Sequence, residues 1–424
     1  MKKHIALLGC LLAFVAVVPA QTTVTVATDN IGYSGSNNGK CVVRDSQGVL
    51  YMVRMAEPVA GTRTLVMDAS YDGGMTWLTL ITSGINDANS GETGTPLVAQ
   101  VSVAIDDQDK LHVIWQRGTS GLYNQYYCSI DPFALTATPY IDLKALMGVN
   151  LSTQTGAAGI AVDANGTVWM AMGSSSSWRA QLIHSDTPYA TTGTFTSVGQ
   201  ISAAASAQSA RIAVDLNGVI HCTYYENTGT GDYRHRAYDP VAASWSVATD
   251  LGNLSPTNDY TGAVVCDYLG NAHMVSMRDS YTSSGASNPT IVYYKRDAAG
   301  TFSAPITVMS ATNAQYATVG NQYIFDIACD EVSGDVYVVF RDFSNGGELT
   351  VHVLPFGASS FTPLFQIAPA NSGQHYYYAP RIRGSLYPAS NNTGSDLHFT
   401  WRQMWPAPYD LKFLALGGTM PPTA

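Results

Sequence analysis

Hydrophobic and polar residues alternate along most of this chain in short runs, and one pattern recurs seven times between residues 41 and 402. Each copy has an apolar run ending in an Asp (absent from the looser last copy), a short turn, and a second apolar run that contains an aromatic residue or His. Alternation with a period of two predicts β-strands, and a turn rich in Gly between two such runs predicts a hairpin. This aromatic or His residue, here called the anchor, is found at Tyr51, His112, Trp169, His221, His273, Tyr337 and His398.

The spacing of the anchors indicates how the hairpins assemble. Successive anchors are 61, 57, 52, 52, 64 and 61 residues apart, which leaves room for two further strands after each hairpin. A four-stranded unit that cannot bury its own face packs radially against copies of itself. The sequence therefore predicts an all-β, seven-bladed β-propeller of four-stranded blades.

The fourth copy shows the expected blade. An innermost strand is expected at 210–214, a second strand at 219–225, a third at 233–238 and an outer strand around 245–248. The turn between the first two strands contains Gly218, which can adopt positive φ. Helical periodicity is limited to 142–147, at most one turn.

The last copy ends early, because only GGTMPPTA follows its expected third strand at 411–416. The alternating segment 22–27 can supply the missing outer strand, which would close the ring and cover an unpaired sheet edge. We expect a single propeller domain over residues 21–424, closed by the N-terminal strand, and a monomer.

Residues 1–20 have the pattern of a secretory signal peptide, with Lys2 and Lys3, an apolar stretch at 5–18 and a cleavage site after Ala20. A lipoprotein signal around Gly9-Cys10 is the rival interpretation, although its apolar region would be short. No other stretch is long enough to cross a membrane. We expect a secreted or periplasmic protein, and whether it is anchored to a surface is left open.

Charge and cysteine content narrow the function classes. Only 12% of residues are charged and the formal net charge is −10, which argues against the basic face of a nucleic-acid binder. Cys222, Cys266 and Cys329 occupy positions that hold Val, Ile or Met in other copies, so we expect them in the core. The state of Cys41 and Cys128 is left open. The cysteine spacing predicts no zinc site, no cofactor is expected, and structural calcium is left open.

Residues 70–77, SYDGGMTW, match the Asp-box pattern Ser-x-Asp-x-Gly-x-Thr-Trp at every defined position. Together with the repeats, this motif resembles the bacterial neuraminidase repeat superfamily of propellers, which includes sialidases. The resemblance implies that the box caps a turn on the face opposite the active site, and that the chain acts on glycans. The chain departs from the sialidase pattern in two respects. No Arg-Ile-Pro segment precedes the first repeat, and Tyr225 and Glu226 are sequence neighbours that would point to opposite strand faces.

Second-strand ends are unusually polar for so uncharged a chain. They carry Gln116-Arg117, Tyr225-Glu226, Arg278-Asp279, Arg341-Asp342 and Arg402-Gln403. Guanidinium groups bind carboxylates or sulfates, and a carboxyl can act as a general acid. We therefore expect an acidic glycan to bind Arg117, Arg278, Arg341 and Arg402, with Tyr225, Glu226, Asp279 and Asp342 as candidate catalytic groups. The alternative is that each charge only bonds the following loop.

The anchor histidines are expected to be structural, because Tyr and Trp fill the same position in other copies. His235 is different, since it lies in a hairpin with Tyr233 and Arg234 and shares a strand face with Tyr233. A base, a phenol and a guanidinium are the parts needed for β-elimination from a uronic acid, and polysaccharide lyases on related propellers use such a set. The alternative is that these three residues only form the polar face of an outer strand.

These patterns predict a secreted, sialidase-like propeller that binds an acidic glycan and cleaves it as a glycoside hydrolase or a uronate lyase. The alternative is a non-catalytic propeller that serves as a cell-surface or protein-interaction module. The sequence leaves open whether the protein is an enzyme, and which sugar and linkage it would recognise.

Overall fold

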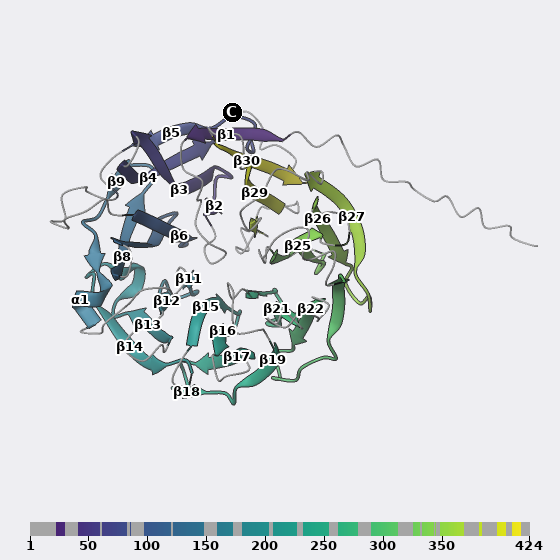
Figure 1. Ribbon diagram of the computed structural model, residues 1–424. Coiled ribbons are helices and arrows are strands. Elements are labelled where there is room, and N and C mark those ends of the chain that lie inside the picture. Colours follow the sequence, from purple (N-terminus) through teal and green to yellow (C-terminus); the bar gives the residue numbers. More distant parts are fainter. Residues whose placement is uncertain are drawn as a thin grey trace, which may run out of the picture.

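The computed structural model describes residues 23–29, 41–59, 62–82, 85, 97–119, 122–147, 159–172, 180–202, 207–226, 232–253, 262–278, 290–312, 325–330, 333–342, 344, 348–368, 381–383, 397–403 and 409–416. The predicted signal peptide at 1–20 and the predicted site residue Asp279 lie outside these residues. Seven antiparallel sheets surround one axis (Figure 1), which confirms the predicted seven-bladed propeller.

The first three blades follow one another along the chain. Blade 1 contains β2 (Val42–Arg44), β3 (Leu50–Val59), β4 (Thr62–Ser70) and β5 (Leu78–Ile81). Blade 2 contains β6 (Leu97–Ile105), β7 (Leu111–Thr119), β8 (Leu122–Asp131), β9 (Thr136–Ala137) and β10 (Ile141–Asp142). Blade 3 contains β11 (Gly159–Val162), β12 (Val168–Met172), β13 (Gln181–Ser185) and β14 (Phe195–Gln200).

The remaining four blades complete the ring. Blade 4 contains β15 (Ala207–Val214), β16 (Ile220–Glu226), β17 (Asp232–Asp239), β18 (Ser244–Trp245) and β19 (Thr249–Asn253). Blade 5 contains β20 (Gly262–Cys266), β21 (Ala272–Arg278), β22 (Thr290–Arg296) and β23 (Ile306–Ser310). Blade 6 contains β24 (Phe325–Cys329), β25 (Val336–Asp342), β26 (Glu348–Leu354) and β27 (Thr362–Ala368). Blade 7 contains β28 (Arg381–Arg383), β29 (Leu397–Gln403), β30 (Tyr409–Leu416) and β1 (Val24–Asp29).

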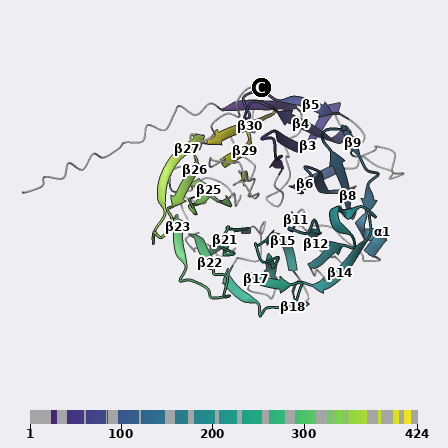
Figure 2. The same cartoon turned by 180° about the vertical axis from the view of Figure 1, so that it is seen from behind.

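The N-terminal strand closes the ring, as the sequence predicts. β1 pairs antiparallel with β30, so that Val24 lies opposite Phe413 and Asp29 opposite Tyr409. Nζ of Lys412 donates a hydrogen bond to Oγ1 of Thr25 at 2.8 Å. The view from behind shows β1 beside β30 at the rim of the ring (Figure 2). This pairing gives blade 7 the outer strand that its own segment lacks.

The sequence prediction misses the division of one outer strand and one short 3-10 turn. The outer strand of blade 4 is divided into β18 and β19, which pair with opposite ends of β17. The single helical turn expected at 142–147 is α1 (Leu143–Met147), and a short 3-10 turn, η1 (Pro188–Ala190), joins β13 to β14. Neither helix is long and apolar enough to cross a membrane, within the described part of the chain.

The core lies between neighbouring blades. Tyr225 and Tyr233 of blade 4 belong to the same buried cluster as Val275 and Ile291 of blade 5. All five described cysteines are buried and none of them forms a disulfide, so Cys41 and Cys128 join the three cysteines that the sequence places in the core. Burial raises the pKa of the Cys128 thiol to about 12, so this side chain behaves as a small apolar group.

Candidate functional site

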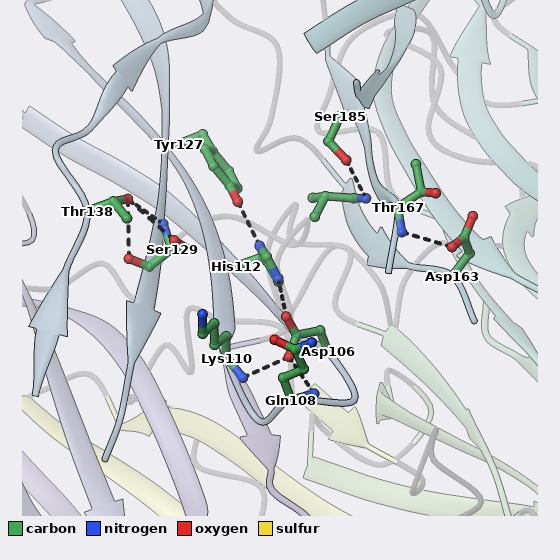
Figure 3. Close-up of polar contacts among 11 residues, drawn as sticks. Asp106, Gln108, Lys110, His112, Tyr127, Ser129, Thr138, Asp163, Thr167 and Ser185 are labelled. Carbon is green, nitrogen blue, oxygen red and sulfur yellow. Dashed lines mark hydrogen bonds and ion pairs between the residues drawn. The ribbon is translucent and has the colours of Figure 1, made fainter. Parts of the chain in front are cut away.

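In blades 1 to 5, the repeat Asp and the anchor bond the first turn of the blade. Asp106 shows the arrangement (Figure 3): its Oδ1 accepts hydrogen bonds from the backbone amides of Gln108 and Lys110, both at 2.9 Å. Its Oδ2 lies 3.0 Å from Nε2 of the anchor His112, and Nδ1 of His112 lies 2.7 Å from the Tyr127 hydroxyl. The anchor thus uses its polar tip to bond the turn.

Other anchors make the same contact with different chemistry. The Trp169 indole donates to Oδ2 of Asp163 at 2.9 Å, and the Tyr51 hydroxyl lies 3.1 Å from Oδ2 of Asp45. A His, a Trp and a Tyr can all donate one hydrogen bond from the tip of an otherwise packed ring. This shared role explains why the sequence accepts all three residue types at one position.

Blade 5 repeats the His version of the contact. Asp267 accepts bonds from the amides of Leu269 and Asn271 and lies 2.9 Å from Nε2 of His273, whose Nδ1 is 2.6 Å from the Tyr293 hydroxyl. Burial alone would raise the pKa of Asp267, but the bonds from His273 and Asn271 outweigh it and lower the pKa to about 2. The carboxylate is therefore a charged structural group.

The turn between β4 and β5, at residues 70–77, is bonded in a similar way. Asp72 accepts bonds from the amide and the hydroxyl of Thr76, at 2.8 and 2.6 Å, and the Ser70 hydroxyl donates to it at 2.8 Å. Gly74 has φ 95°, and a Cβ there would lie 2.0 Å from the Phe413 ring. Trp77 packs edge-on against the same Phe413, with ring centroids 5.1 Å apart. This turn therefore fastens blade 1 to blade 7.

Because strands 1–2 and 3–4 of each blade are joined at one end of the ring, we call it the turn end. The opposite end, where second strands finish, we call the far end. Glu226 is the last residue of β16, Arg278 the last of β21, and Arg341-Asp342 the last two of β25, whereas Arg117 and Arg402 lie near the ends of β7 and β29. The backbone thus places these predicted residues at the far end. The side chains of Arg117, Arg278 and Arg402 lie outside the described atoms.

Arg341 and Asp342 are both buried, at 4% and 6% exposure. Asp342 accepts bonds from the amide and the hydroxyl of Ser344, at 2.8 and 2.5 Å, in the segment that follows the strand. Arg341 shares a strand face with Val339, which packs against Phe399 of blade 7. The Asp342 contact is the kind that the loop-bonding alternative predicts.

Glu226 forms a compact polar group on one face of blade 4. Its two carboxylate oxygens lie 2.5 Å from Nε of Arg234 and 2.5 Å from the Ser202 hydroxyl, which belongs to the segment leading from blade 3. Glu226 is buried, whereas the Arg234 side chain is 25% exposed. Tyr224, on the same face, has a buried hydroxyl with no hydrogen-bond partner among the described residues. A partly exposed guanidinium on a buried carboxylate can also bind a second anion.

The opposite face of blade 4 carries Tyr225, Tyr233 and His235, all at most 1% exposed, so Tyr225 and Glu226 do point to opposite faces. Tyr233 lies directly on Gly262 of blade 5, where a Cβ would be 1.6 Å from its Cζ. Its hydroxyl lies beside that of Thr223, although neither makes a well-aligned hydrogen bond. Burial raises the pKa of Tyr233, so the phenol stays protonated.

One charged pair near the axis was not predicted. Arg211 of β15 and Asp326 of β24 are buried and lie 3.9 Å apart (Nη1 to Oδ1), although blade 5 separates their blades. Burial lowers the pKa of Arg211, and the charge of Asp326 opposes this effect. A repeat alignment could have found the pair, because both residues lie four positions before the repeat Asp. Other blades have small residues there: Cys41, Ser102, Gly159 and Ala263.

The structure therefore brings Glu226 and Arg234 into contact and places Tyr233 and His235 on one face, but it does not bring Asp342 to them. Within the described residues, no group of three or more His, Cys, Asp or Glu side chains could hold a metal ion. The far end of blade 4 can bind an anion through Arg234 and can exchange a proton through Glu226, whereas His235 is buried in mid-strand on the opposite face.

No protein-family model matches this chain, and no curated protein matches it. Solved structures do match. An ulvan lyase, described as a new family of polysaccharide lyase, has a TM-score of 0.52 and 12% identity, covering 92% of this chain and 96% of that one. The polysaccharide lyase Uly1 has a TM-score of 0.54 and 10% identity, covering 92% of both chains.

A sialidase of Trypanosoma rangeli, in complex with the inhibitor DANA, has a TM-score of 0.53 and 11% identity. The match covers 94% of this chain but only 60% of the sialidase chain, so this chain spans less than two thirds of that relative. At such identities the similarity shows the fold alone. The chain is a seven-bladed β-propeller whose fold is similar to that of these polysaccharide lyases and this sialidase.

Proposed function

We propose that this protein is a secreted propeller that binds an acidic glycan at the far end of blade 4. The observation that carries the proposal is the Arg234–Glu226 pair, a quarter-exposed guanidinium fixed on a buried carboxylate at 2.5 Å. An exposed part of a guanidinium that lies next to a buried carboxylate can bind the carboxylate or sulfate of a ligand. Tyr224 lies on the same face of the blade and adds a phenol group, whereas Tyr233 lies on the opposite face.

The similar structures support an acidic ligand. One ulvan lyase structure contains -[GlcA(1-4)Rha3S]-, which carries a uronate and a sulfate, and a sialidase structure contains sialic acid. The net charge of −10 makes a few local arginines the natural place for an anion to bind. The turn at 70–77 has the bonds that an Asp box requires, which supports membership of the neuraminidase repeat superfamily.

Cleavage is the second part of the proposal, and the residues favour two routes. In hydrolysis, a protonated Glu226 would give its proton to the leaving oxygen while water adds to the anomeric carbon and releases a proton that restores Glu226, and Arg234 would hold the sugar carboxylate. In elimination from a uronate, His235 would take the proton at C5 and Tyr233 would protonate the leaving oxygen, but Arg234, which the sequence assigns to the carboxylate, lies on the opposite face of β17. Tyr233 and His235 are buried, so elimination would require blades 4 and 5 to separate at this end.

A non-catalytic interaction module is the second candidate, and one observation favours it. Large apolar side chains are exposed on the turns of several blades: Tyr71, Met75, Leu216, Tyr268, Leu269 and Phe356, each between 41% and 62% exposed. Exposed apolar groups on one face are typical of protein interaction sites. This face lies opposite the proposed glycan site.

A substrate screen tests the proposal. Purified protein would be incubated with sialyllactose, ulvan and other uronate polysaccharides, with neutral dextran as the control. Released reducing ends report hydrolysis, and absorbance of unsaturated uronate reports elimination. Binding without any product would support the proposal that the protein binds an acidic glycan and would contradict the proposal that it cleaves one. Absence of binding to every acidic glycan would overturn the proposal and favour the interaction module. The mass of the mature N-terminus tests the predicted secretion signal.

A further inference from the structure

Blade 4 differs from blades 2 and 5 at one position of an otherwise repeated contact. In blades 2 and 5 an Asp bonds Nε2 of the anchor His, and Nδ1 of that His contacts a Tyr hydroxyl from the third strand, Tyr127 or Tyr293. In blade 4 the corresponding residue of the third strand is His235. Its Nε2 lies 3.1 Å from Nδ1 of His221, and Nε2 of His221 lies 3.3 Å from Oδ2 of Asp215.

The hydrogen-bond directions follow from the carboxylate. An ionised carboxyl only accepts, so Nε2 of His221 carries the proton and Nδ1 of the neutral ring accepts. In blades 2 and 5 the Tyr hydroxyl donates to that Nδ1. In blade 4 the donor has to be Nε2–H of His235, which leaves Nδ1 of a neutral His235 without a proton. Because blade 4 has His235 where blades 2 and 5 have a Tyr, the last group in its series of hydrogen bonds is an acceptor, Nδ1 of His235.

That acceptor has no partner. Nδ1 of His235 is buried in a residue with 1% exposure and forms no hydrogen bond within the described part of the chain. Thr223 is its register partner on β16 and Tyr233 lies two residues earlier on β17, so two further hydroxyl groups share this strand face. A buried acceptor without a partner costs about 1–3 kcal/mol, and natural proteins usually satisfy such groups with a ligand or water.

We propose that Nδ1 of His235 is a subsite for one hydroxyl group, kept in its accepting form by His221 and Asp215. The hydroxyl belongs either to a bound sugar or to a buried water molecule, because both donate the same hydrogen bond. Asp215 and His221 act here as positioning residues. Only the sugar form of the inference rests on the proposed function.

Acid should abolish the subsite. Burial lowers the pKa of His235 well below its ordinary value, and the neighbouring His221 and Arg296 act in the same direction. Burial likewise lowers the pKa of His221, against the opposing effect of Asp215. The other groups near this face are Arg211, Tyr233 and the apolar ring of Phe302. With folded pKa values below the unfolded value of about 6.5, neutral histidines stabilise the fold above that pH, and this stabilisation is lost as the pH falls.

Two substitutions at His235 distinguish the role of the Nδ1 acceptor from the role of the Nε2–H donor. His235→Tyr restores the residue of blades 2 and 5, so it keeps the donor to His221 but removes the acceptor. His235→Gln keeps both, because its amide can donate to His221 and its carbonyl can accept, and it does not titrate. Both variants should fold, and both should lose less stability between pH 7 and pH 5 than the unmodified protein.

The test combines imidazole ¹⁵N NMR at pH 7.5 with crystal structures in the presence and absence of sialyllactose and ulvan oligosaccharides. We expect a His235 signal with a proton on Nε2 and none on Nδ1, identified by its loss in His235→Tyr. A sugar hydroxyl at Nδ1 would make His235→Tyr bind these oligosaccharides roughly 5- to 50-fold more weakly, with His235→Gln near the unmodified protein. A water at Nδ1 would leave binding unchanged. A proton on Nδ1, or an Nδ1 with neither hydroxyl beside it, would overturn the subsite, whatever the outcome of the substrate screen.

Discussion

The turn end and the far end of the ring hold their polar groups in different ways. At the turn end, Asp106 and its counterparts bond amides two and four residues later and an anchor six residues later, so these repeated bonds are local. At the far end, Glu226 bonds Ser202, and in the innermost strands Arg211 contacts Asp326 across an intervening blade. Repeated local bonds hold the propeller fold together, here called the frame, whereas contacts found in one blade are the candidates for the proposed function.

Removal of the closing strand should have the largest effect, because it opens the frame itself. Deletion of residues 23–29 exposes the edge of β30 and removes the apolar cover that Val26 and Ala27 give to blade 1. We expect a loss of several kcal/mol and a fall in the melting temperature of roughly 10 °C or more, measured by calorimetry. Thr25→Val, which loses only the exposed bond from Lys412, is the control and should melt close to the unmodified protein. An unchanged melting curve for the deletion would contradict the closure.

Asp267→Ala tests the turn end within one blade. The substitution leaves the amides of Leu269 and Asn271 and the Nε2–H of His273 without their acceptor. We expect the free energy of unfolding in urea to fall by about 3 kcal/mol, since several buried donors lose their partner together. Binding of acidic glycans should not change. A loss below about 0.5 kcal/mol, the range of surface substitutions, would show that the turn does not depend on these bonds.

Arg341→Ala tests whether a buried arginine at the far end stabilises the fold or binds the ligand. Binding of an acidic glycan, measured by calorimetric titration, should weaken by roughly 1.5–3 kcal/mol if Arg341 contacts it. Arg341→Met keeps an apolar side chain of similar length and removes the charge, so it separates lost packing from lost charge. If the Met variant binds like the unmodified protein, Arg341 belongs to the frame.

Asp72→Ala should have the smallest effect. The side chain accepts bonds mainly within its own exposed turn, from Ser70 and Thr76. We expect a loss of about 1 kcal/mol in thermal unfolding, with no change in glycan binding. A change in glycan affinity without a change in stability would reverse the assignment of the two ends.

The frame was predictable from the sequence because its determinants are local and repeated. The interval from Asp106 to His112 recurs in four other blades, so the turn, the anchor and the blade number follow from spacing. The missing outer strand of blade 7 likewise directs attention to the alternating segment near the N-terminus. The site was less predictable. The contacts of Ser202 with Glu226 and of Arg211 with Asp326 depend on how blades face one another. No hydrophobic pattern along one chain segment specifies them.

The most direct test of the central claim is the affinity of Arg234→Ala for an acidic glycan that the unmodified protein binds, with Asp72→Ala as the matched control from the turn end. Because Arg234→Ala leaves the buried Glu226 carboxylate without its ionic partner, it should also lower stability, so binding is compared at a temperature at which both variants are folded. The account predicts that Arg234→Ala binds the glycan roughly 10- to 100-fold more weakly, while Asp72→Ala binds it unchanged. Equal affinity of Arg234→Ala and the unmodified protein would contradict a glycan site at the far end of blade 4.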